Sequence, residues 1–308
     1  MSGRTDRRAY DPHFGVAYRS AEAILSHAEF PRARLVYLDS VLTLYGGNAF
    51  LNKLLMEAAR IVIFAVVICL EAGYRKEDRA TWPTVGNLKK ALALFNIASP
   101  RRIDHVLGRL IQTGYLESKV SPQDRRARLL LPTDRMKRHD QDWLAAHYAP
   151  LAILYGDADY ALPLRGDPEF QRVQRQIATG FFAQSAMVLL RNPDIMLFLT
   201  RDAGILVLAQ LVKEAMSQGA TTVPLSFADL SRRFVVSRTH VRQLLMDAEA
   251  QGLVALSQDR RQVTLTPRIL GSLNQFIADG MSNHDLTGAA ARKALAEMRT
   301  TTAMVPDA

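Results

Sequence analysis

The chain has 308 residues, 48% of them apolar and 22% charged, so most of it is expected to fold, and its length is typical of about two domains. A formal net charge of +9 favours a polyanionic partner, nucleic acid before a membrane surface. The single cysteine, Cys69, excludes an intramolecular disulfide and is interpreted as an inert buried thiol.

The N-terminal segment carries arginines (Arg4, Arg7 and Arg8) and few apolar residues. Residues 1–15 are therefore predicted to form a flexible basic arm, and the lack of an apolar stretch there predicts no signal peptide.

Helical segments are expected over residues 20–56, interrupted at Pro31 and at Gly46-Gly47. The most apolar segment, within residues 57–73, is much shorter than the roughly 20 residues of a membrane-spanning helix. We expect a buried helix there, in a cytoplasmic protein that does not contact a membrane.

Two helices joined by a turn are expected after the polar connection that follows residue 73. Thr84 is the expected N-cap of the first helix. Ser99 is the expected N-cap of the second, where Pro100 occupies a first position that needs no N–H. One face of the second helix is apolar (Ile103, Val106, Leu107 and Leu110), and Gly114 is placed to end it.

A hairpin with a basic loop is expected next. Residues 115–120 and 128–133 are predicted to be its strands, and the loop between them contains Asp124-Arg125-Arg126. A long helix is expected over residues 134–155. Two helices followed by a hairpin with a basic tip are typical of a winged helix-turn-helix.

The same order of elements is expected again beyond a loop-rich boundary at residues 156–168. The expected elements are helices within residues 180–190 and 193–219, a second helix pair within 224–253, a second hairpin within 254–266 and a closing helix over 267–281.

A constant spacing relates the two halves. Ser99 and Ser237 lie 138 positions apart, and the same spacing separates Leu92 from Leu230, Ile97 from Val235, Ile103 from Val241, and Gly114 from Gly252. The spacing is 135 between Asp124 and Asp259, which belong to a repeated Gln-Asp-Arg-Arg tetrapeptide, so the first arm of the second hairpin is expected to be shorter. Constant elements with variable connections indicate a structural duplication.

These positions resemble the MarR-type winged-helix transcription regulators of bacteria. The first copy offers Leu92-Ala93, Ser99, Val106, Leu110, Gly114-Tyr115-Leu116, Asp124-Arg125-Arg126 and Thr133. The second offers Leu230, Ser237, Val241, Leu244, Gly252-Leu253-Val254, Asp259-Arg260-Arg261 and Leu265-Thr266. The chain departs from the family pattern at Pro132, Met136 and Ile269, in its short second hairpin, and in its length, since members are usually half as long and pair as homodimers.

The resemblance implies a mainly α fold with small β-wings, in which two tandem winged helix-turn-helix modules pack through flanking helices, as a dimer fused into one chain. The expected parts are a flexible arm (1–15), a first module (16–158), a second module (159–285) and a C-terminal tail (286–308). The implied function is sequence-specific binding of double-stranded DNA, hence transcription control at the nucleoid. The recognition helices would enter successive major grooves, and Arg-tipped wings would enter minor grooves.

The candidate DNA-contacting residues lie on the exposed recognition-helix faces and in the hairpins. Arg101 and Arg102 are the best candidates for base or phosphate contacts in the first copy. The full set is Ser99, Arg101, Arg102, His105, Arg109, Lys119, Arg125, Arg126, Arg128, Ser237, Arg238, Thr239, His240, Arg242, Gln243, Arg260 and Arg261. The resemblance assigns Asp124 and Asp259 the role of orienting a wing arginine. Because the two helix faces differ, the two halves are expected to read different half-sites.

Charge is expected to make the first module the stronger DNA binder. Residues 99–138 contain ten Lys or Arg against four Asp or Glu, whereas residues 237–268 contain five against three.

The main alternative is a scaffold, in which the first module binds DNA and the second binds RNA polymerase or another regulator. An enzyme is not expected, since the sequence holds no P-loop, dinucleotide fingerprint or nucleophile elbow. No metal or cofactor is expected, since the histidines lack neighbouring ligands at zinc spacing. The aromatic residues are interpreted as core, with a ligand pocket between helices as the alternative; they are Trp143, Tyr148, Phe181, Phe182 and Phe198. Nothing in the sequence supports a small-molecule effector.

Overall fold

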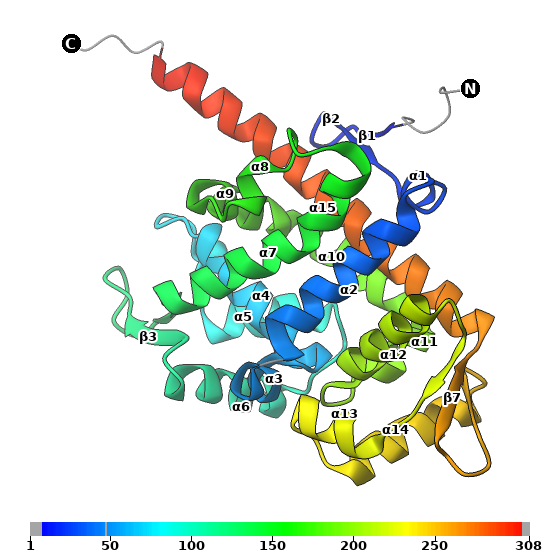
Figure 1. Cartoon of the computed structure of the whole chain (residues 1–308). Helices are drawn as coiled ribbons and strands as arrows, with labels where there is room; N and C mark the ends of the chain where they lie inside the picture. Colours follow the sequence, from blue (N-terminus) through cyan, green and yellow to red (C-terminus); the bar gives the residue numbers. More distant parts are fainter. Residues whose placement is uncertain (1–7, 47, 304–308) are drawn as a thin grey trace, which may run out of the picture.

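The computed structural model describes residues 8–46 and 48–303, which are mainly helical with small antiparallel sheets (Figure 1). The helices before residue 156 are α1 (Ala21–Leu25), α2 (Phe30–Gly46), α3 (Ala49–Leu55), α4 (Ala58–Ala72), the 3₁₀ helix η1 (Arg79–Thr81), α5 (Val85–Ala93), α6 (Pro100–Gln112) and α7 (Asp134–Tyr155). Those that follow are α8 (Ala161–Leu164), α9 (Pro168–Ala178), η2 (Thr179–Phe181), α10 (Phe182–Leu190), α11 (Pro193–Leu199), α12 (Gly204–Gln218), α13 (Phe227–Phe234), α14 (Arg238–Ala250) and α15 (Pro267–Ala303).

The strands are β1 (Arg8–Asp11), β2 (Val16–Arg19), β3 (Leu116–Val120), β4 (Arg128–Pro132), β5 (Thr222–Pro224), β6 (Val254–Leu256) and β7 (Gln262–Leu265). β1 pairs with β2 and β3 with β4, while the third sheet has the order β5-β7-β6. The hairpin β3–β4 has no third strand in the described residues, but the Leu130 amide donates to the Pro83 carbonyl at 2.7 Å. That bond ties the hairpin to the segment that precedes α5.

The helix pair and hairpin expected in each half are confirmed. We call them unit 1 (residues 84–133) and unit 2 (residues 226–266). Each of their four helices begins at a polar N-cap whose oxygen accepts a backbone N–H (Thr84, Ser99, Ser226 and Ser237). α6 and α14 are followed by Gly114 and Gly252, whose φ angles of 72° and 71° are in the left-handed region that glycine adopts without strain.

The spacing of 138 does not hold through both helices of each unit, contrary to expectation. Ser99 and Ser237 share a role as caps, but Thr84 and Ser226, the caps of the preceding helices, lie 142 positions apart. The connection between α5 and α6 is therefore longer than that between α13 and α14. Surface connections change length more easily than packed helices, which explains why unit 1 has its additional residues mainly in the connection between α5 and α6.

Buried side chains from both halves form one large cluster. In the helical body, α2 packs on α7 and α12, and α15 packs on α7 and α9. The loop-rich segment 156–168 contributes Tyr160 to this core, where its hydroxyl donates to Asp285 at 2.8 Å. The division expected at residue 158 does not coincide with a break in the core.

The C-terminal tail expected at residues 286–308 is wrong as far as Ala303, because α15 continues through it. Leu286, Ala291 and Leu295 are buried and extend the apolar face of the helix. Gly288 lets α15 approach α7, since a Cβ there would lie 2.6 Å from the Tyr148 hydroxyl.

The flexible arm expected at residues 1–15 is also wrong from Arg8 onward. β1 pairs with β2 in register from Arg8 opposite Arg19 to Asp11 opposite Val16. β2 packs on α15, and the Arg19 amide donates to Asp285 at 2.6 Å. Arg4 and Arg7 lie outside the described residues.

The segment 193–219 is two helices, not one continuous helix. α11 and α12 meet at 112°, and Ala203 before the second has a φ of 54°. Gly204 is required at this bend because a Cβ would lie 2.2 Å from the Phe198 carbonyl oxygen. Among the described residues no single helix is long and apolar enough to cross a membrane. The bent pair of α11 and α12 reaches the necessary length and apolar composition only when the two helices are taken together.

Candidate nucleic-acid interface

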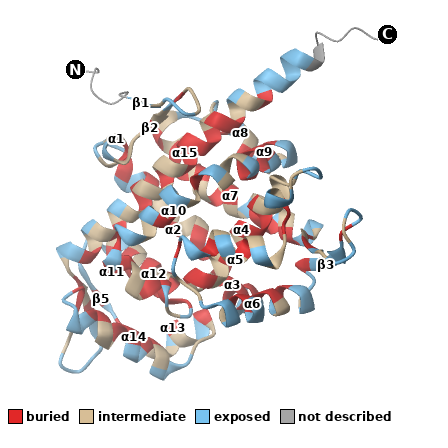
Figure 2. Ribbon diagram, turned by 180° about the vertical axis from the view of Figure 1, so that it is seen from behind, coloured by how far each residue is buried: buried red, intermediate tan, exposed pale blue. Residues whose placement is uncertain are grey.

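α6 and α14 lie at the same end of the molecule, away from the two chain termini (Figure 1). The hairpins that contain β3 and β7 project at opposite corners of this end, and Figure 2 shows that much of this surface is exposed. The body therefore holds both helices at one end of the protein.

The outer face of α6 carries exposed cationic and polar side chains. Arg101, His105 and Arg109 are exposed, and their side chains form no hydrogen bond or ion pair with the described residues. Ser99 caps the helix by accepting the Arg102 amide at 3.3 Å. Its hydroxyl is thus committed to the helix, whereas the three longer side chains are available to a partner.

Arg102, expected to contact a base or a phosphate, is instead tied to the helical body. Its Nη2 donates to Glu57 Oε2 at 3.0 Å, and the Glu57 side chain is only 11% exposed. Glu57 is also the N-cap of α4. The pair holds the start of α6 against the start of α4. The sequence of α6 alone could not predict this pairing, because Glu57 lies outside that helix.

The tip of the first hairpin presents two arginines. Arg125 and Arg126 are exposed, and neither guanidinium has a partner among the described residues. Asp124 shapes the tip, because its Oδ1 accepts the Arg126 amide at 2.9 Å. Its Oδ2 accepts Nη2 of Arg79 at 2.7 Å.

The arginine that Asp124 orients is thus Arg79, which lies outside the hairpin and was missed from the sequence. Arg79 lies over the Trp82 ring at 5.2 Å and is 71% exposed. The two residues of the ion pair are 45 positions apart, so no local motif joins them.

Two other predicted contacts of the first hairpin are occupied within the protein. Lys119 pairs with Glu117, and the Arg128 guanidinium donates to the Ser118 hydroxyl at 3.0 Å and to its carbonyl at 2.6 Å. The Arg128 hydrogen bonds tie β4 to β3 behind the exposed tip.

Fewer side chains on the outer face of α14 than on that of α6 are without an intramolecular partner among the described residues. Arg238 and Thr239 are exposed, and their side chains have no partner among the described residues. Ser237 caps the helix through the His240 amide, and the His240 ring contacts the Asp202 carbonyl at 2.9 Å. Arg242 lies over the Phe227 ring and Gln243 donates to Asp247 at 2.7 Å.

Asp259 does not orient an arginine side chain, contrary to expectation. Its Oδ1 accepts the Ser257 hydroxyl at 2.7 Å and the Arg261 amide at 3.1 Å. These two hydrogen bonds lower the pKa of Asp259. Arg260 has a φ of 55°, and its guanidinium reaches Met246 Sδ at 3.9 Å. Of the two arginines at this tip, Arg261 has an exposed guanidinium that forms no hydrogen bond or ion pair with the described residues, although its charge helps to lower the pKa of Asp259.

Further cations near the two units were not singled out from the sequence. Lys90 on α5 is exposed without a partner in the described residues, and Arg233 on α13 is exposed beside the Phe234 ring. Both are on helices that precede the expected recognition helices. Within residues 8–46 and 48–303 no group of three or more His, Cys, Asp or Glu side chains is arranged to hold a metal ion.

No family model, curated protein or solved structure matches this chain.

Proposed function

We propose that the protein is a sequence-specific regulator of transcription that binds double-stranded DNA through two tandem winged helix-turn-helix modules, units 1 and 2. α6 and α14 enter successive major grooves, and the two hairpin tips reach the flanking minor grooves. Such a protein acts on the bacterial nucleoid. The MarR-type resemblance supports the same reading.

The observation that carries the proposal is the shared end of the molecule on which both helices present cations without an intramolecular partner. Arg101 and Arg109 on α6, and Arg238 on α14, are exposed and unpaired among the described residues. A rigid body that orders two such helices at one end reduces the entropic cost of binding two sites at once.

We also propose that the preferred DNA site is asymmetric and that one chain fills it. α6 offers Arg101, His105 and Arg109, whereas α14 offers Arg238 and Thr239, so the two helices read different bases. Symmetry does not force a palindrome on a single chain that supplies both modules.

Genome-wide mapping of bound DNA, with the mass of the complex on one isolated site, tests both statements. The expected result is one motif without internal symmetry and a mass of one chain per site. No enriched motif would refute sequence-specific binding, and two chains on a strict palindrome would refute the asymmetric site.

The second candidate is a scaffold in which only unit 1 binds DNA and unit 2 binds a protein of the transcription machinery. It is favoured by the smaller number of unpaired cations on unit 2, where Arg242 and Gln243 contact Phe227 and Asp247. Changing Arg238 and Arg242 together to Ala distinguishes the two. DNA affinity falls more than tenfold if both units bind DNA, and it is unchanged while regulation is lost if unit 2 binds a protein.

A further inference from the structure

The two units use the third residue of their expected recognition helix in the same way. Arg102 and His240 both follow the N-cap by three positions, and they lie 138 positions apart, the spacing that relates the two units. Arg102 Nη2 donates to Glu57 Oε2 at 3.0 Å, and His240 Nε2 lies 2.9 Å from the Asp202 carbonyl oxygen. Equivalent positions of the duplicated helices are thus both used for contacts within the protein.

The partners of Arg102 and His240 are joined to each other by one residue of α4, Arg60. Its Nη2 pairs with Asp202 Oδ1 at 2.8 Å, and its Nε lies 3.6 Å from Glu57 Oε2. Asp202 takes part through both its carboxylate and its carbonyl. A continuous chain of contacts therefore runs from α6 to α14, in the order Arg102, Glu57, Arg60, Asp202 and His240. We call these five residues the polar bridge.

The centre of the polar bridge is shielded from water. The side chains of Glu57 and Arg60 are 11% and 18% exposed, whereas those of Arg102 and Asp202, toward its ends, are 41% and 54% exposed. An exposed ion pair contributes little by itself, but pairs away from bulk water are screened less by salt. Arg60 Nη1 also donates to the Lys53 carbonyl at 2.8 Å, which restrains the central guanidinium.

Two further hydrogen bonds beside the polar bridge join its surroundings to the second half of the chain. Asn52 is 3% exposed, and its Nδ2 donates to the Phe234 carbonyl at 2.6 Å. Phe234 is the last residue of α13, and carbonyls at a helix C-terminus have no donor within the helix. The Met56 carbonyl accepts the Ala203 amide at 2.8 Å. α3 and the start of α4 are therefore held against the turn that precedes α14.

We propose that the polar bridge fixes the separation of the first turns of α6 and α14, and that the protein therefore accepts two DNA half-sites at a single spacing. Two recognition helices on a rigid body match only half-sites whose spacing equals the separation of the helices. One added base pair moves the half-sites apart by about 3.4 Å and rotates one relative to the other by about 34°. The fixed separation stands on the contacts alone, whereas the spacing rule rests on the proposed function.

Distances between spin labels on the two helices, measured by pulsed electron paramagnetic resonance on the full chain, test the fixed separation. The labels are attached through Gln112→Cys on α6 and Ala250→Cys on α14, because both positions are exposed and lie outside the polar bridge. Cys69 is buried, and burial raises the pKa of its thiol to about 12, so it does not react with the label. The expected result is one narrow distribution of distances.

Glu57→Gln and Asp202→Ala should each broaden this distribution or shift its mean. Glu57→Gln removes the charge that the two arginines of the polar bridge share, and it keeps a side-chain oxygen for the N-cap of α4. Asp202→Ala removes an exposed carboxylate and decides the test if Glu57→Gln does not fold. Asn274→Leu is the matched control, because it removes a hydrogen bond from Arg34 at 2.7 Å that joins α2 to α15 and involves neither unit. A distribution left unchanged by both bridge variants, or altered equally by the control, would overturn the proposal.

DNA binding then tests the spacing rule, with affinities measured by fluorescence anisotropy on sites with and without one base pair inserted between the half-sites. In the wild type and in Asn274→Leu, the insertion should lower affinity by about tenfold or more, because contacts at one half-site are lost. In Asp202→Ala this loss should be smaller by about threefold, as for the loss of one exposed ion pair. General destabilisation would weaken binding to both sites alike and leave the ratio of the two affinities unchanged.

The possible failures of this test are distinguishable. If the spin labels respond as expected and the protein binds no DNA, the polar bridge stands and the proposed function falls. If the wild type binds both sites equally well, the proposed function stands and the spacing rule is refuted. An insertion that lowers the affinity of Asp202→Ala as much as that of the wild type would show that the polar bridge does not set the spacing.

Discussion

The guanidinium groups of the neighbouring residues Arg101 and Arg102 differ in their surroundings. Arg102 is 41% exposed and pairs with Glu57, while Arg101 points to solvent and has no partner among the described residues. Sequence pattern placed both on the exposed face of one helix. The partner of Arg102 is 45 positions away in the sequence. Only the packing of α6 on α4 therefore shows that Arg102 positions the helix and that Arg101 is the candidate DNA contact.

Arg101→Ala should lower affinity for the preferred DNA site by about 1–3 kcal/mol and relax specificity at one base pair, because a base contact is lost without loss of fold. Arg102→Ala is the matched neighbour. It should leave Glu57 without its partner and lower the free energy of unfolding. Affinity by fluorescence anisotropy and stability by urea unfolding separate the two effects. Equal losses of specificity in both variants would contradict these roles.

The buried ring of His147 predicts a dependence of stability on pH. Its pKa of about 4 in the folded protein is lower than the value of about 6.5 expected when unfolded, so the folded state binds fewer protons. The resulting stability is complete above pH 6.5 and is lost as pH falls towards 4, by on the order of 3 kcal/mol. His284 contributes in the same direction, because desolvation lowers its pKa too.

Urea unfolding at pH 7.5 and pH 5 measures this effect. The wild type should lose stability between these values, and His147→Phe should lose less of it, since the titrating ring is gone. His105→Gln removes an exposed histidine on α6 and should behave as the wild type. A loss in His147→Phe as large as in the wild type would show that other groups produce the pH dependence.

At the scale of elements, caps and glycine stops were predictable, and the ends of the chain were not. Ser99, Ser237, Gly114 and Gly252 act locally, within a few residues, and all four were placed correctly. α15 extends far past its expected end because its continuation packs on β2, α1 and α9. Those partners come from distant segments, so local periodicity underestimated the helix.

The crossing of α15 over α7 gives a prediction about one glycine. Gly288→Ala should destabilise the protein by about 1–3 kcal/mol, because the added Cβ would lie 2.6 Å from the hydroxyl of the fully buried Tyr148. Gly271→Ala, at an exposed position of the same helix, should stabilise it by about 0.5–1 kcal/mol through helix propensity. Thermal unfolding of both variants measures the contrast. A neutral effect of Gly288→Ala would mean that Tyr148 moves aside at little cost.

At the scale of the whole molecule, one core joins the two halves and places α6 and α14 at one end. If the proposed function holds, the two units read a site with two different halves. Replacing the half-site read by α14 with an inverted copy of the half read by α6 should weaken binding by about tenfold or more, since each mismatched base pair costs about 1–3 kcal/mol. Gel-shift titration of the natural and the inverted sites measures this. Equal affinity would show that the halves read the same bases.

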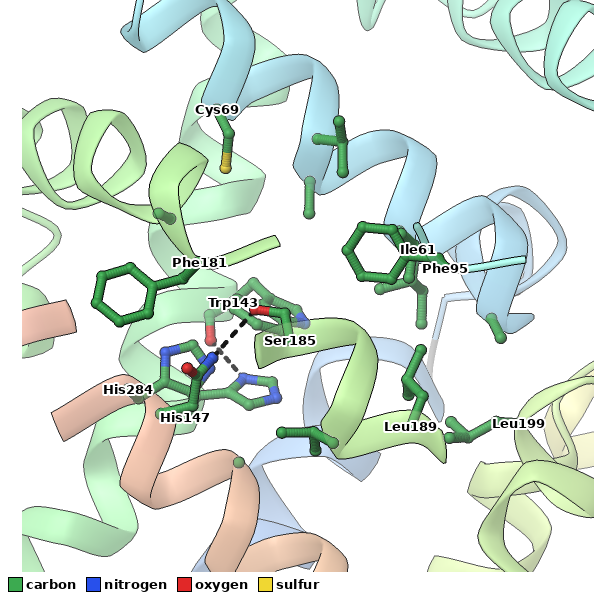
Figure 3. Close-up of a pocket in the computed structure, with 18 of the residues that line it drawn as sticks. Ile61, Cys69, Phe95, Trp143, His147, Phe181, Ser185, Leu189, Leu199 and His284 are labelled. Carbon is green, nitrogen blue, oxygen red and sulfur yellow. Dashed lines mark hydrogen bonds between the residues drawn. The ribbon is translucent and has the colours of Figure 1, made fainter. Parts of the chain in front are cut away.

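The sequence by itself determined the helix pairs, their caps, the glycine stops and the basic hairpin tips, because these depend on the backbone and side-chain chemistry of neighbouring residues. It also indicated the unequal hairpin arms, and β6 is indeed shorter than β3. Tertiary structure alone decided which cations remain unpaired. Arg102, Arg128 and Arg242 looked available within their own segments, yet each contacts a group on a neighbouring strand or helix. The pocket beside His284 (Figure 3) likewise exists only where helices from both halves meet, since no single segment carries its walls.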